Sequence, residues 1–346
     1  MASRKEVAQI AGVSEATVSR VLNGVGPMKE ETRQRVLAAA RQVGYTPNAI
    51  ARSFATRRSG HLGVVMPYVP KARLFSAYYF SEILSGIGSR AQANKYDLLM
   101  LFREPGGTMD YMNLFRSRKV DACIILGAKD ELGEREAIRE LDQGGHPYCL
   151  INQRFDGENF HVVDADHAEG GYRAVRHLLQ AGYRRIAFLN GPDVYSNSRD
   201  RLAGYRRALD EAGITPDESL LFEGNFSRKS GHAAAEFIAP LLPGIDAVFA
   251  ANDRMAIGLS QGLRARGVKP EHMPALVGYD DSDSAEMSDP PLTSVRVPFY
   301  QLGELAASHV LRLLEEQGGP ADRRERMHLQ LPTELIVRAS SLNRTM

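Results

Sequence analysis

The chain has little of what marks secreted, membrane or disulfide-rich proteins. Only two of its 346 residues are cysteine, Cys123 and Cys149. Both lie in apolar runs, so we expect buried free thiols in a reducing cytoplasm. No apolar run approaches the roughly 20 residues that span a bilayer, and the N-terminus turns charged at once, unlike a secretory signal. We therefore expect a cytoplasmic protein without membrane contact.

The signatures of enzymes and metal sites are missing as well. The sequence has no Gly-x-Ser-x-Gly elbow, no P-loop and no GxGxxG. Its nine histidines show no ligand spacing with cysteine. The stretch Asp281-Ser-Asp283 lacks the glycine and the terminal glutamate of a calcium loop. The sequence thus predicts no catalysis, no metal and no cofactor.

What the chain does have is a strong separation of charge. Residues 1–60 contain ten Lys or Arg and four Glu, a net charge of +6, whereas the whole chain is only +1. A basic segment on a neutral to acidic body is typical of a nucleic-acid-binding arm. A chain of this length that is 43% hydrophobic can also bury a large core and divide into two or three units.

The basic segment carries three short helical patterns. Gly12 permits a sharp turn after the first, and Ser14 can cap a second helix that ends at Asn23. A third helix follows over about Lys29–Val43. Two short helices around a glycine turn, supported by a third, predict a helix-turn-helix domain over residues 1–46. The alternative is a three-helix bundle with no role on DNA.

A fourth, weaker helical pattern lies in residues 47–60. Pro47 stops the third helix from continuing, and Asn48 can cap a helix of about eight residues, which is marginal alone in water. Residues 56–60 follow as a basic tether. The segment is either a plain linker or a hinge helix that folds on DNA.

From His61 the sequence changes to short apolar runs that alternate with helical stretches. The runs cover residues 62–66, 96–101, 122–126, 148–151, 185–189, 247–250 and 275–279. Such alternation predicts parallel sheets covered by helices on both faces. The predicted fold class is an all-α helix-turn-helix domain plus an α/β body of two Rossmann-like parallel-sheet lobes with a cleft between them.

These motifs resemble the LacI/GalR family of bacterial transcription regulators over essentially the whole chain. The resemblance rests on Val13–Asn23, Glu31–Val36, Gly44–Asn48 and Ala51–Ser53. It implies a body like a periplasmic sugar-binding protein, whose lobes are joined by three crossings that we place near residues 160, 290 and 323. The N-lobe would comprise residues 61–160 with 291–322, and the C-lobe 161–290 with 323–346.

The resemblance also implies how the arm reads DNA, with the second helix in the major groove and paired hinge helices in the minor groove. The DNA-binding residues it implies are Ser14, Glu15, Ala16, Thr17, Arg20, Asn23, Asn48, Arg52 and Phe54. Arg20 suits a bidentate contact with guanine. Phe54 stands where the family usually has a leucine that wedges open a base step. This departure leaves open that Phe54 packs on its partner hinge or on the body.

Effector contacts are implied beyond the carboxyl ends of the strands, where open parallel sheets bind ligands. The residues are Tyr79, Phe80, Arg201, Phe226, Asn252, Asp280 and Phe299. Arg201, Asn252 and Asp280 together offer the donors and acceptors that sugar hydroxyls need. The aromatic rings could stack on a sugar or on a purine.

Several of these residues also have plain structural interpretations. Arg201 could pair with Asp200 or with a helix end, and Tyr79 or Phe80 could belong to the core. Asp253, like Asp166, is expected to cap a helix N-terminus.

One departure bears on the charge of the ligand. The segment of residues 68–77 is longer and more basic than the loop that the family usually has here, since it contains Lys71 and Arg73. Arg103 and Arg154 are expected near the same face. An acidic or phosphorylated effector is therefore an alternative to a neutral sugar.

The sequence as a whole predicts a repressor that binds a palindromic operator as a homodimer and is controlled by a sugar-like effector in the cleft. No leucine heptads follow the body, which argues against a helical tetramerisation tail. Alternatives are a purine- or protein-corepressed regulator, a sensor that acts through a protein partner such as a phosphocarrier, and an architectural DNA protein with an incidental body.

Overall fold

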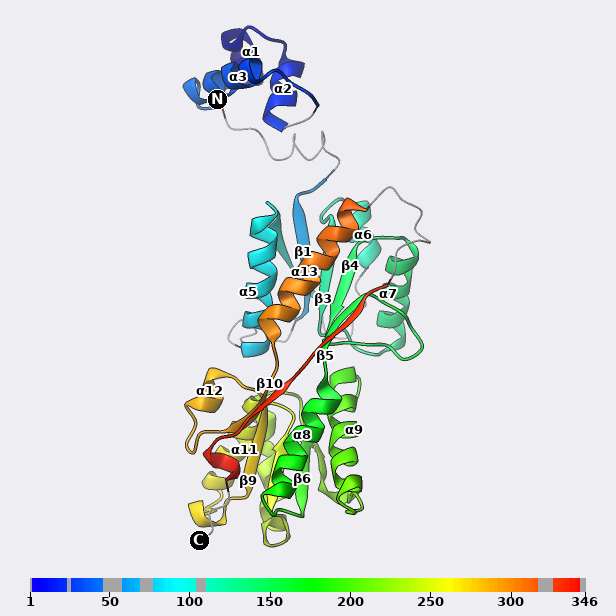
Figure 1. Cartoon of the computed structure of the whole chain (residues 1–346), viewed down its shortest axis with the longest axis vertical. Helices are drawn as coiled ribbons and strands as arrows, with labels where there is room; N and C mark the ends of the chain where they lie inside the picture. The colour runs from blue at the N-terminus through cyan, green and yellow to red at the C-terminus, as the bar shows by residue number, and fades with distance from the viewer. Residues whose placement is uncertain are drawn as a thin grey trace.

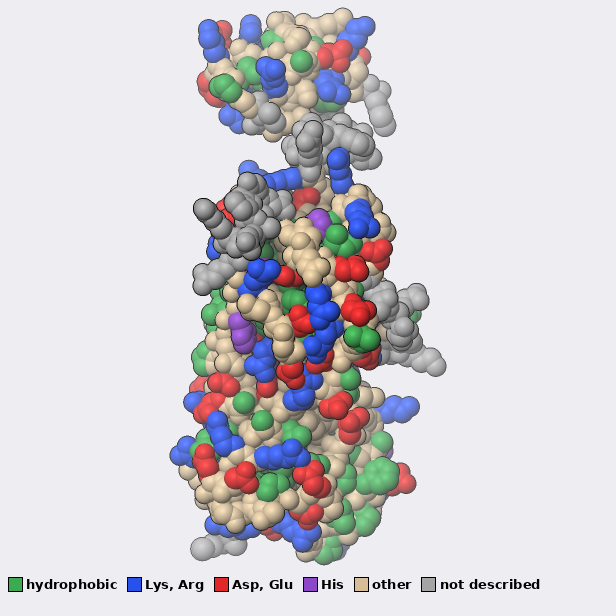
Figure 2. All heavy atoms as spheres, turned by 90° about the vertical axis from the view of Figure 1, so that its right-hand side faces the viewer, with side chains coloured by type: hydrophobic (Ala, Val, Ile, Leu, Met, Phe, Trp, Pro, Cys, Tyr) green, Lys and Arg blue, Asp and Glu red, His purple; other side chains and the backbone are tan. Residues whose placement is uncertain are grey.

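The computed structural model describes residues 2–23, 26–45, 58–68, 77–103, 110–316 and 326–342 of the chain. A small helical domain, an N-lobe and a C-lobe follow one another along the long axis (Figure 1). Lys or Arg and Asp or Glu side chains are interspersed on the face of the two lobes seen in Figure 2. The negative charge of the body is therefore not gathered into one patch on that face.

The helical domain contains α1 (Arg4–Ala11), α2 (Glu15–Asn23) and α3 (Glu30–Gln42). Val7, Val18 and Val36, one from each helix, are fully buried at its centre. Gly12 ends α1 in the left-handed region with φ 64°, which a residue with a β-carbon rarely adopts. This turn lets α2 cross α1, as the helix-turn-helix prediction required.

The N-lobe is built on a six-stranded parallel sheet in the order β11-β5-β4-β3-β1-β2. Its strands are β1 (His61–Pro67), β2 (Asp97–Arg103), β3 (Ala122–Leu126), β4 (Tyr148–Ile151), β5 (Val162–Ala165) and β11 (His328–Leu331). One face packs on α5 (Tyr78–Ala93) and α13 (Phe299–Glu315), and the other on α6 (Tyr111–Arg116) and α7 (Leu132–Gln143). Because β3 and β4 are buried on both faces, their sequences are continuous apolar runs.

The C-lobe repeats this plan with the order β12-β10-β9-β8-β6-β7, in which only β12 is antiparallel. Its strands are β6 (Ile186–Asn190), β7 (Leu221–Glu223), β8 (Ala247–Ala250), β9 (Ala275–Asp280), β10 (Thr293–Arg296) and β12 (Glu334–Ile336). Its helices are α8 (His167–Gln180), α9 (Ser196–Glu211), α10 (Arg228–Ile238), α11 (Asp253–Ala265) and α12 (Asp283–Glu286), with short 3-10 segments at Glu218–Leu220, Ala239–Gly244, Pro270–His272 and Ala339–Ser341. The predicted fold class is thus confirmed.

Neighbouring helices in both lobes approach to backbone contact on paired glycines. A β-carbon on Gly86 of α5 would lie 2.0 Å from the carbonyl oxygen of Tyr300 on α13, and one on Gly303 would lie 2.2 Å from that of Ile83. The same arrangement joins α8 to α9 through Gly171 and Gly204, and α10 to α11 through Gly231 and Gly258. These glycines fix how closely the helical layers pack.

Three segments cross between the lobes, after β5, after β10 and between β11 and β12 (Figure 1). The crossings therefore come after Ala165, Arg296 and Leu331, a few residues later than the predicted positions 160, 290 and 323. The predicted lobe boundaries were early because β5, β10 and β11 are four-residue strands with polar residues. An apolar-run pattern does not detect such strands.

Cys123 and Cys149 are buried free thiols on neighbouring strands, as expected. Burial raises the pKa of both thiols well above the usual range. None of the helices in the described part of the chain has the length and hydrophobicity to cross a membrane.

Candidate functional site

The second helix of the arm presents its predicted DNA-reading residues to solvent. Val18 and Val21 are buried, while Glu15, Ala16 and Arg20 are exposed on the same helix. The hydroxyl of Ser14 accepts the backbone N–H of Thr17 at 3.2 Å and so caps the helix. Asn23 is half-buried at the other end and donates to Ser19. The helix is therefore packed on one side and free to enter a groove on the other. Asn48, Arg52 and Phe54 lie outside the described residues.

The end of the 47–60 segment is tied to the top of the N-lobe. The backbone N–H groups of Ser59 and Gly60 donate to the two carboxylate oxygens of Asp121 at 2.7 and 2.9 Å. Arg58 donates to the carbonyl of Leu314, near the end of α13, at 3.1 Å. The residues that lead into β1 are thus fixed to the N-lobe by both backbone and side-chain hydrogen bonds.

A cavity of about 370 Å³ lies between the lobes at the carboxyl ends of both sheets. Six of the seven predicted effector residues line it, namely Tyr79, Phe80, Arg201, Phe226, Asn252 and Asp280. The lining also includes Asn152, Tyr195, Asn197, Arg228 and Arg254, which the sequence analysis did not single out. Residues that are more than 200 positions apart in the sequence thus meet at one small concave site, as ligand sites in such folds do.

Phe299 is the predicted residue that does not line this cavity. It is 2% exposed and lies behind the lining, with its ring 5.1 Å from that of Tyr79 and 6.1 Å from that of Tyr78. Edge-on contacts of this kind fix ring orientation. Phe299 therefore supports the aromatic wall instead of forming it.

Arg201 does not pair with Asp200, which was one of its structural interpretations. Its guanidinium lies 4.1 Å above the ring of Tyr279, and the side chain is 3% exposed. Asp200 instead accepts from Arg154 of the other lobe. The charge of Arg201 is thus held in place by an aromatic face rather than by a carboxylate.

Asn252 has a structural role in addition to its place on the cavity wall. Its side-chain oxygen accepts from the backbone N–H of Met255 at 2.8 Å, which makes it the N-cap of α11. Its side-chain nitrogen donates to the carbonyl of Phe226 at 3.0 Å and so holds that residue, at φ 63°, in the wall. The expectation that Asp253 caps this helix was therefore wrong, whereas Asp166 does cap α8.

Asp253 instead supports the strand end that carries Asp280. Its carboxylate accepts from the hydroxyls of Ser282 and Ser294 at 2.9 and 2.6 Å, and from the backbone of Ser282. Burial, and then the charge of Asp253, raise the pKa of Asp280 well above its usual range, while Arg201 and Arg254 lower it. Asp280 is held at φ 108° and 8% exposed, at the cavity wall.

Arg103 and Arg154, which suggested an acidic ligand, are both occupied by carboxylates of the protein. Arg103 forms a buried ion pair with Glu134, which also accepts from the hydroxyl of Tyr111. Arg154 pairs with Asp200. These two arginines therefore give no support for an anionic ligand, and Lys71 and Arg73 lie outside the described residues.

Known proteins share this arrangement. The family models for LacI-family bacterial regulatory proteins and for periplasmic-binding-protein-like domains match residues 4–48 and 175–341. The transcriptional regulator DegA of Bacillus subtilis is 31% identical over 97% of both chains. A regulator CelR–cellobiose complex covers 98% of this chain and all of its own, with 32% identity and a TM-score of 0.71. A lac repressor dimer bound to operator and the anti-inducer ONPF covers 99% of both chains, with 26% identity and a TM-score of 0.84.

A helix-turn-helix arm on a two-lobed body with a cavity at its sheet ends defines a DNA-binding transcription regulator, and not an enzyme. The chain belongs to the LacI family of bacterial regulatory proteins.

Proposed function

We propose that this regulator is a cytoplasmic repressor that binds a palindromic operator as a homodimer, and that a small sugar-like effector in the cleft controls its affinity for DNA. The observation that carries the proposal is the cavity whose walls come from both lobes, combined with an arm tied to the N-lobe. A ligand that holds the lobes together changes the orientation of the N-lobe, and the Asp121 tether transmits that change to the arm. The ligand either favours the same lobe arrangement as DNA and acts as a corepressor, or favours a different one and acts as an inducer. In both cases the coupling between ligand and DNA is reciprocal.

The lining supports a polar, ring-shaped effector. Rings of Tyr79, Phe80 and Phe226 offer flat apolar surfaces, and Arg201 and Asp280 offer donors and acceptors. The related CelR was solved with cellobiose and the lac repressor with ONPF. A sugar or sugar derivative therefore fits this cavity better than a large or wholly apolar molecule.

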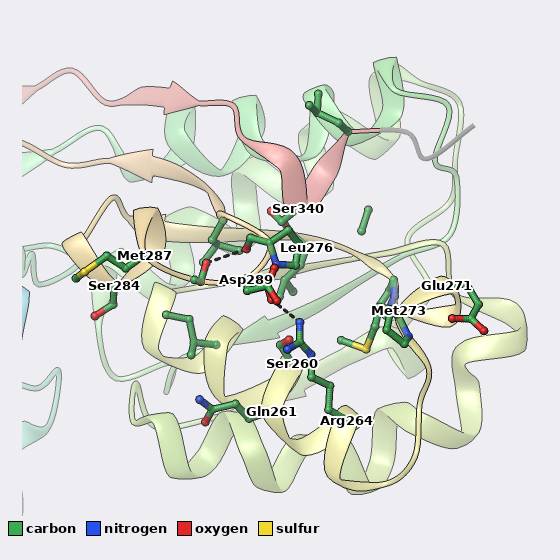
Figure 3. Close-up of a pocket in the computed structure, with 18 of the residues that line it drawn as sticks. Ser260, Gln261, Arg264, Glu271, Met273, Leu276, Ser284, Met287, Asp289 and Ser340 are labelled. Atoms are coloured by element: carbon green, nitrogen blue, oxygen red, sulfur yellow. Dashed lines mark hydrogen bonds between the residues drawn. The ribbon is translucent and has the colours of Figure 1, made fainter. Parts of the chain in front are cut away.

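A homodimer is supported by exposed apolar side chains in both lobes, one of which borders a second hollow in the C-lobe. The hollow, of about 660 Å³, lies between α11, the segment before β9 and the residues after α12 (Figure 3). Met287 at its edge is 76% exposed. In the N-lobe, Phe102 on the edge strand β2 is 41% exposed beside Tyr68. A second copy of the chain would cover such surfaces.

Selection of binding sites from randomised duplex DNA with the full chain tests the proposal. We expect an inverted repeat, because two recognition helices related by a twofold axis read two half-sites. Arg20→Ala should relax base preference at one symmetric position in each half-site. Arg41→Ala, which removes the same charge from α3, should leave the preference unchanged. A site without symmetry contradicts the homodimer.

Purine corepression and a phosphocarrier partner remain the alternatives. Titration of purines, sugars and a phosphocarrier protein into the complex of the chain with the selected DNA separates them, because only the true effector changes the affinity.

A further inference from the structure

We propose that the N-lobe itself contacts the operator, and that two cationic turns at its arm-facing edge bind phosphates of the DNA backbone. The turns are Lys95, between α5 and β2, and Arg118–Lys119, between α6 and β3. The inference rests on DNA binding by the arm and is independent of any effector in the cleft. It goes beyond the proposed function, in which the arm alone contacts DNA.

The two turns lie on either side of the point where the chain enters the N-lobe from the arm. In the sheet, β1 stands between β3 and β2. The backbone N–H of Asp97 donates to the carbonyl of Gly60, and that of Asp121 donates to the carbonyl of His61, both at 2.9 Å. Each cationic turn is within three residues of one of these bonds. Since this edge of the N-lobe faces the helical domain (Figure 1), the turns are on the side of the body that is directed toward bound DNA.

The positive charge of this edge exceeds the negative charge beside it. Four exposed side chains make no ion pair with any residue that the structure describes, namely Lys95, Arg116, Arg118 and Lys119. The carboxylate of Asp121 is occupied by two backbone N–H groups. Asp97 and Glu315 are exposed acids of the same region. The four cations are therefore available to an anionic partner.

The segment that joins the arm to this edge adds positive charge and no negative charge. Residues 46–60 contain Arg52, Arg57 and Arg58 and neither Asp nor Glu. Like charges repel one another over a Debye length, about 10 Å at 0.1 M salt. The cationic turns are therefore not placed to form ion pairs with this segment. A polyanion such as the DNA backbone, bound beside both, attracts the segment and the turns together.

The backbone conformation of the two turns is independent of these charge arguments. Lys95 and Arg118 have φ angles of 60° and 54°, in the left-handed region, and each is the second residue after its helix. Five other helices end with the same conformation at the same position, and there the residue is always glycine: Gly44, Gly145, Gly182, Gly213 and Gly267, after α3, α7, α8, α9 and α11. A residue with a β-carbon is disfavoured in this conformation.

The helix dipole does not account for cations at these two positions. Arg90 and Arg116 already lie in the last turns of α5 and α6, where a cation interacts favourably with the helix end in an ordinary helical conformation. Lysine and arginine thus replace glycine only at helix ends beside the entry of the arm, and at a cost in backbone conformation. The geometry points to a function of the charge itself. Long cationic side chains that meet the DNA backbone add affinity without base preference.

Substitution by glycine tests this inference, because glycine removes the charge and suits the left-handed backbone. In Lys95→Gly and in Arg118→Gly, the affinity of the full chain for the selected operator should fall about tenfold at about 0.1 M salt, as measured by fluorescence anisotropy. The thermal midpoint should stay the same or rise. The slope of log affinity against log salt concentration should decrease in magnitude by about two in each variant, because a dimer loses two phosphate contacts.

Two further measurements separate a backbone contact from other effects. Arg184→Gln, which removes an exposed cation before β6 in the C-lobe, should keep the native affinity and salt slope. Operator duplexes in which one phosphate at a time is replaced by an uncharged methylphosphonate locate the contact. At least one replacement should weaken binding of the native chain severalfold and have little effect on the double variant Lys95→Gly/Arg118→Gly.

The outcomes separate this inference from the proposed function. It is overturned if the folded double variant binds the operator with native affinity and salt slope, if Arg184→Gln causes equal losses, if the base preference changes in the glycine variants, or if every methylphosphonate affects both chains alike. A decrease in slope of about one instead of two per substitution supports the phosphate contact and contradicts the homodimer. Because no effector is present in these measurements, a failure of effector control leaves their result unchanged.

Discussion

A terminal nitrogen of Arg154 donates to both carboxylate oxygens of Asp200, at 2.5 and 2.6 Å, and so joins the loop after β4 in the N-lobe to α9 in the C-lobe. Ser196 at the start of α9 makes two further bonds across the same boundary: its hydroxyl accepts from the backbone N–H of Arg154, and its own backbone N–H donates to the side-chain oxygen of Gln153. The lobes are therefore held together beside the cavity by a small set of polar contacts.

Asp200→Asn should loosen this closure without changing the shape of the side chain. The side chains of Arg154 and Asp200 are 31% and 17% exposed. Solvent screening therefore limits the contribution of this ion pair to lobe closure to about 1 kcal/mol. We expect ligand affinity to fall about three- to tenfold by calorimetry, because the closed state becomes less populated. Glu218→Gln, which breaks the exposed pair with Arg206 within the C-lobe, is the matched control. Equal losses in both variants would show that the interlobe contact has no special effect.

A pH dependence of stability should come from Asp164, which is fully buried next to the first crossing. Burial raises its pKa to about 7, and Arg154 lowers it only in part. The folded chain therefore favours the protonated form, and stability from this group is present at low pH and lost as the pH rises from about 4 to 7. The loss is at most about 4 kcal/mol.

Asp164→Asn should remove that part of the dependence. We expect its thermal midpoint to exceed that of the native chain at pH 8 by several degrees, and to differ little from it at pH 5. Some dependence remains, because burial also raises the pKa of Asp253 to about 7. A difference between variant and native chain that is the same at both pH values would refute the assignment.

The wall formed by Phe226 depends on the absence of a side chain at position 191. A β-carbon on Gly191 would lie 2.0 Å from the Phe226 ring. Gly191→Ala should displace the ring, lower stability by about 1–3 kcal/mol and weaken ligand binding about tenfold. Gly88→Ala on α5 is the control, because its nearest neighbour would be at an ordinary 3.8 Å. Unchanged ligand affinity in Gly191→Ala would show that Phe226 does not shape the site.

The Asp121 tether should matter for signalling more than for folding. Asp121→Ala removes both contacts to the base of the arm and should reduce the ligand-dependent change in operator affinity at least severalfold, as measured by fluorescence anisotropy. Binding of ligand to the body should persist. Asp97→Ala, at an exposed aspartate that begins β2, serves as the control. A full ligand response in Asp121→Ala would mean that another route connects the cleft to the arm.

The sequence alone was sufficient to predict those strands whose residue types are decided by burial. Strands β3, β4 and β8 lie at the predicted positions, because strands buried on both faces must be continuous apolar runs. Short strands at the sheet edges and crossings were missed, since β10 mixes polar and apolar residues over four positions. The glycine pairs between helices carried no signal, because close approach is visible only once both partners are placed.

The site was predictable in part for a similar reason. Asp280 ends a strong apolar strand, and that position together with the family resemblance directed attention to it. Asn152 also follows a predicted strand, but its orientation depends on a contact with His167, which in turn contacts Tyr279 more than 100 residues away. Local sequence does not contain such a relationship.

The most direct test of the central claim is the operator affinity of the full chain, measured with and without the sugar that it binds most tightly, in the native chain and in Asp280→Ala. The account predicts at least a tenfold ligand-dependent change in the native chain. It predicts less than a twofold change in Asp280→Ala, with unaltered affinity for operator in the absence of ligand. The account would be contradicted if the operator affinity of the native chain did not change when the ligand bound, or if Asp280→Ala showed the full ligand-dependent change.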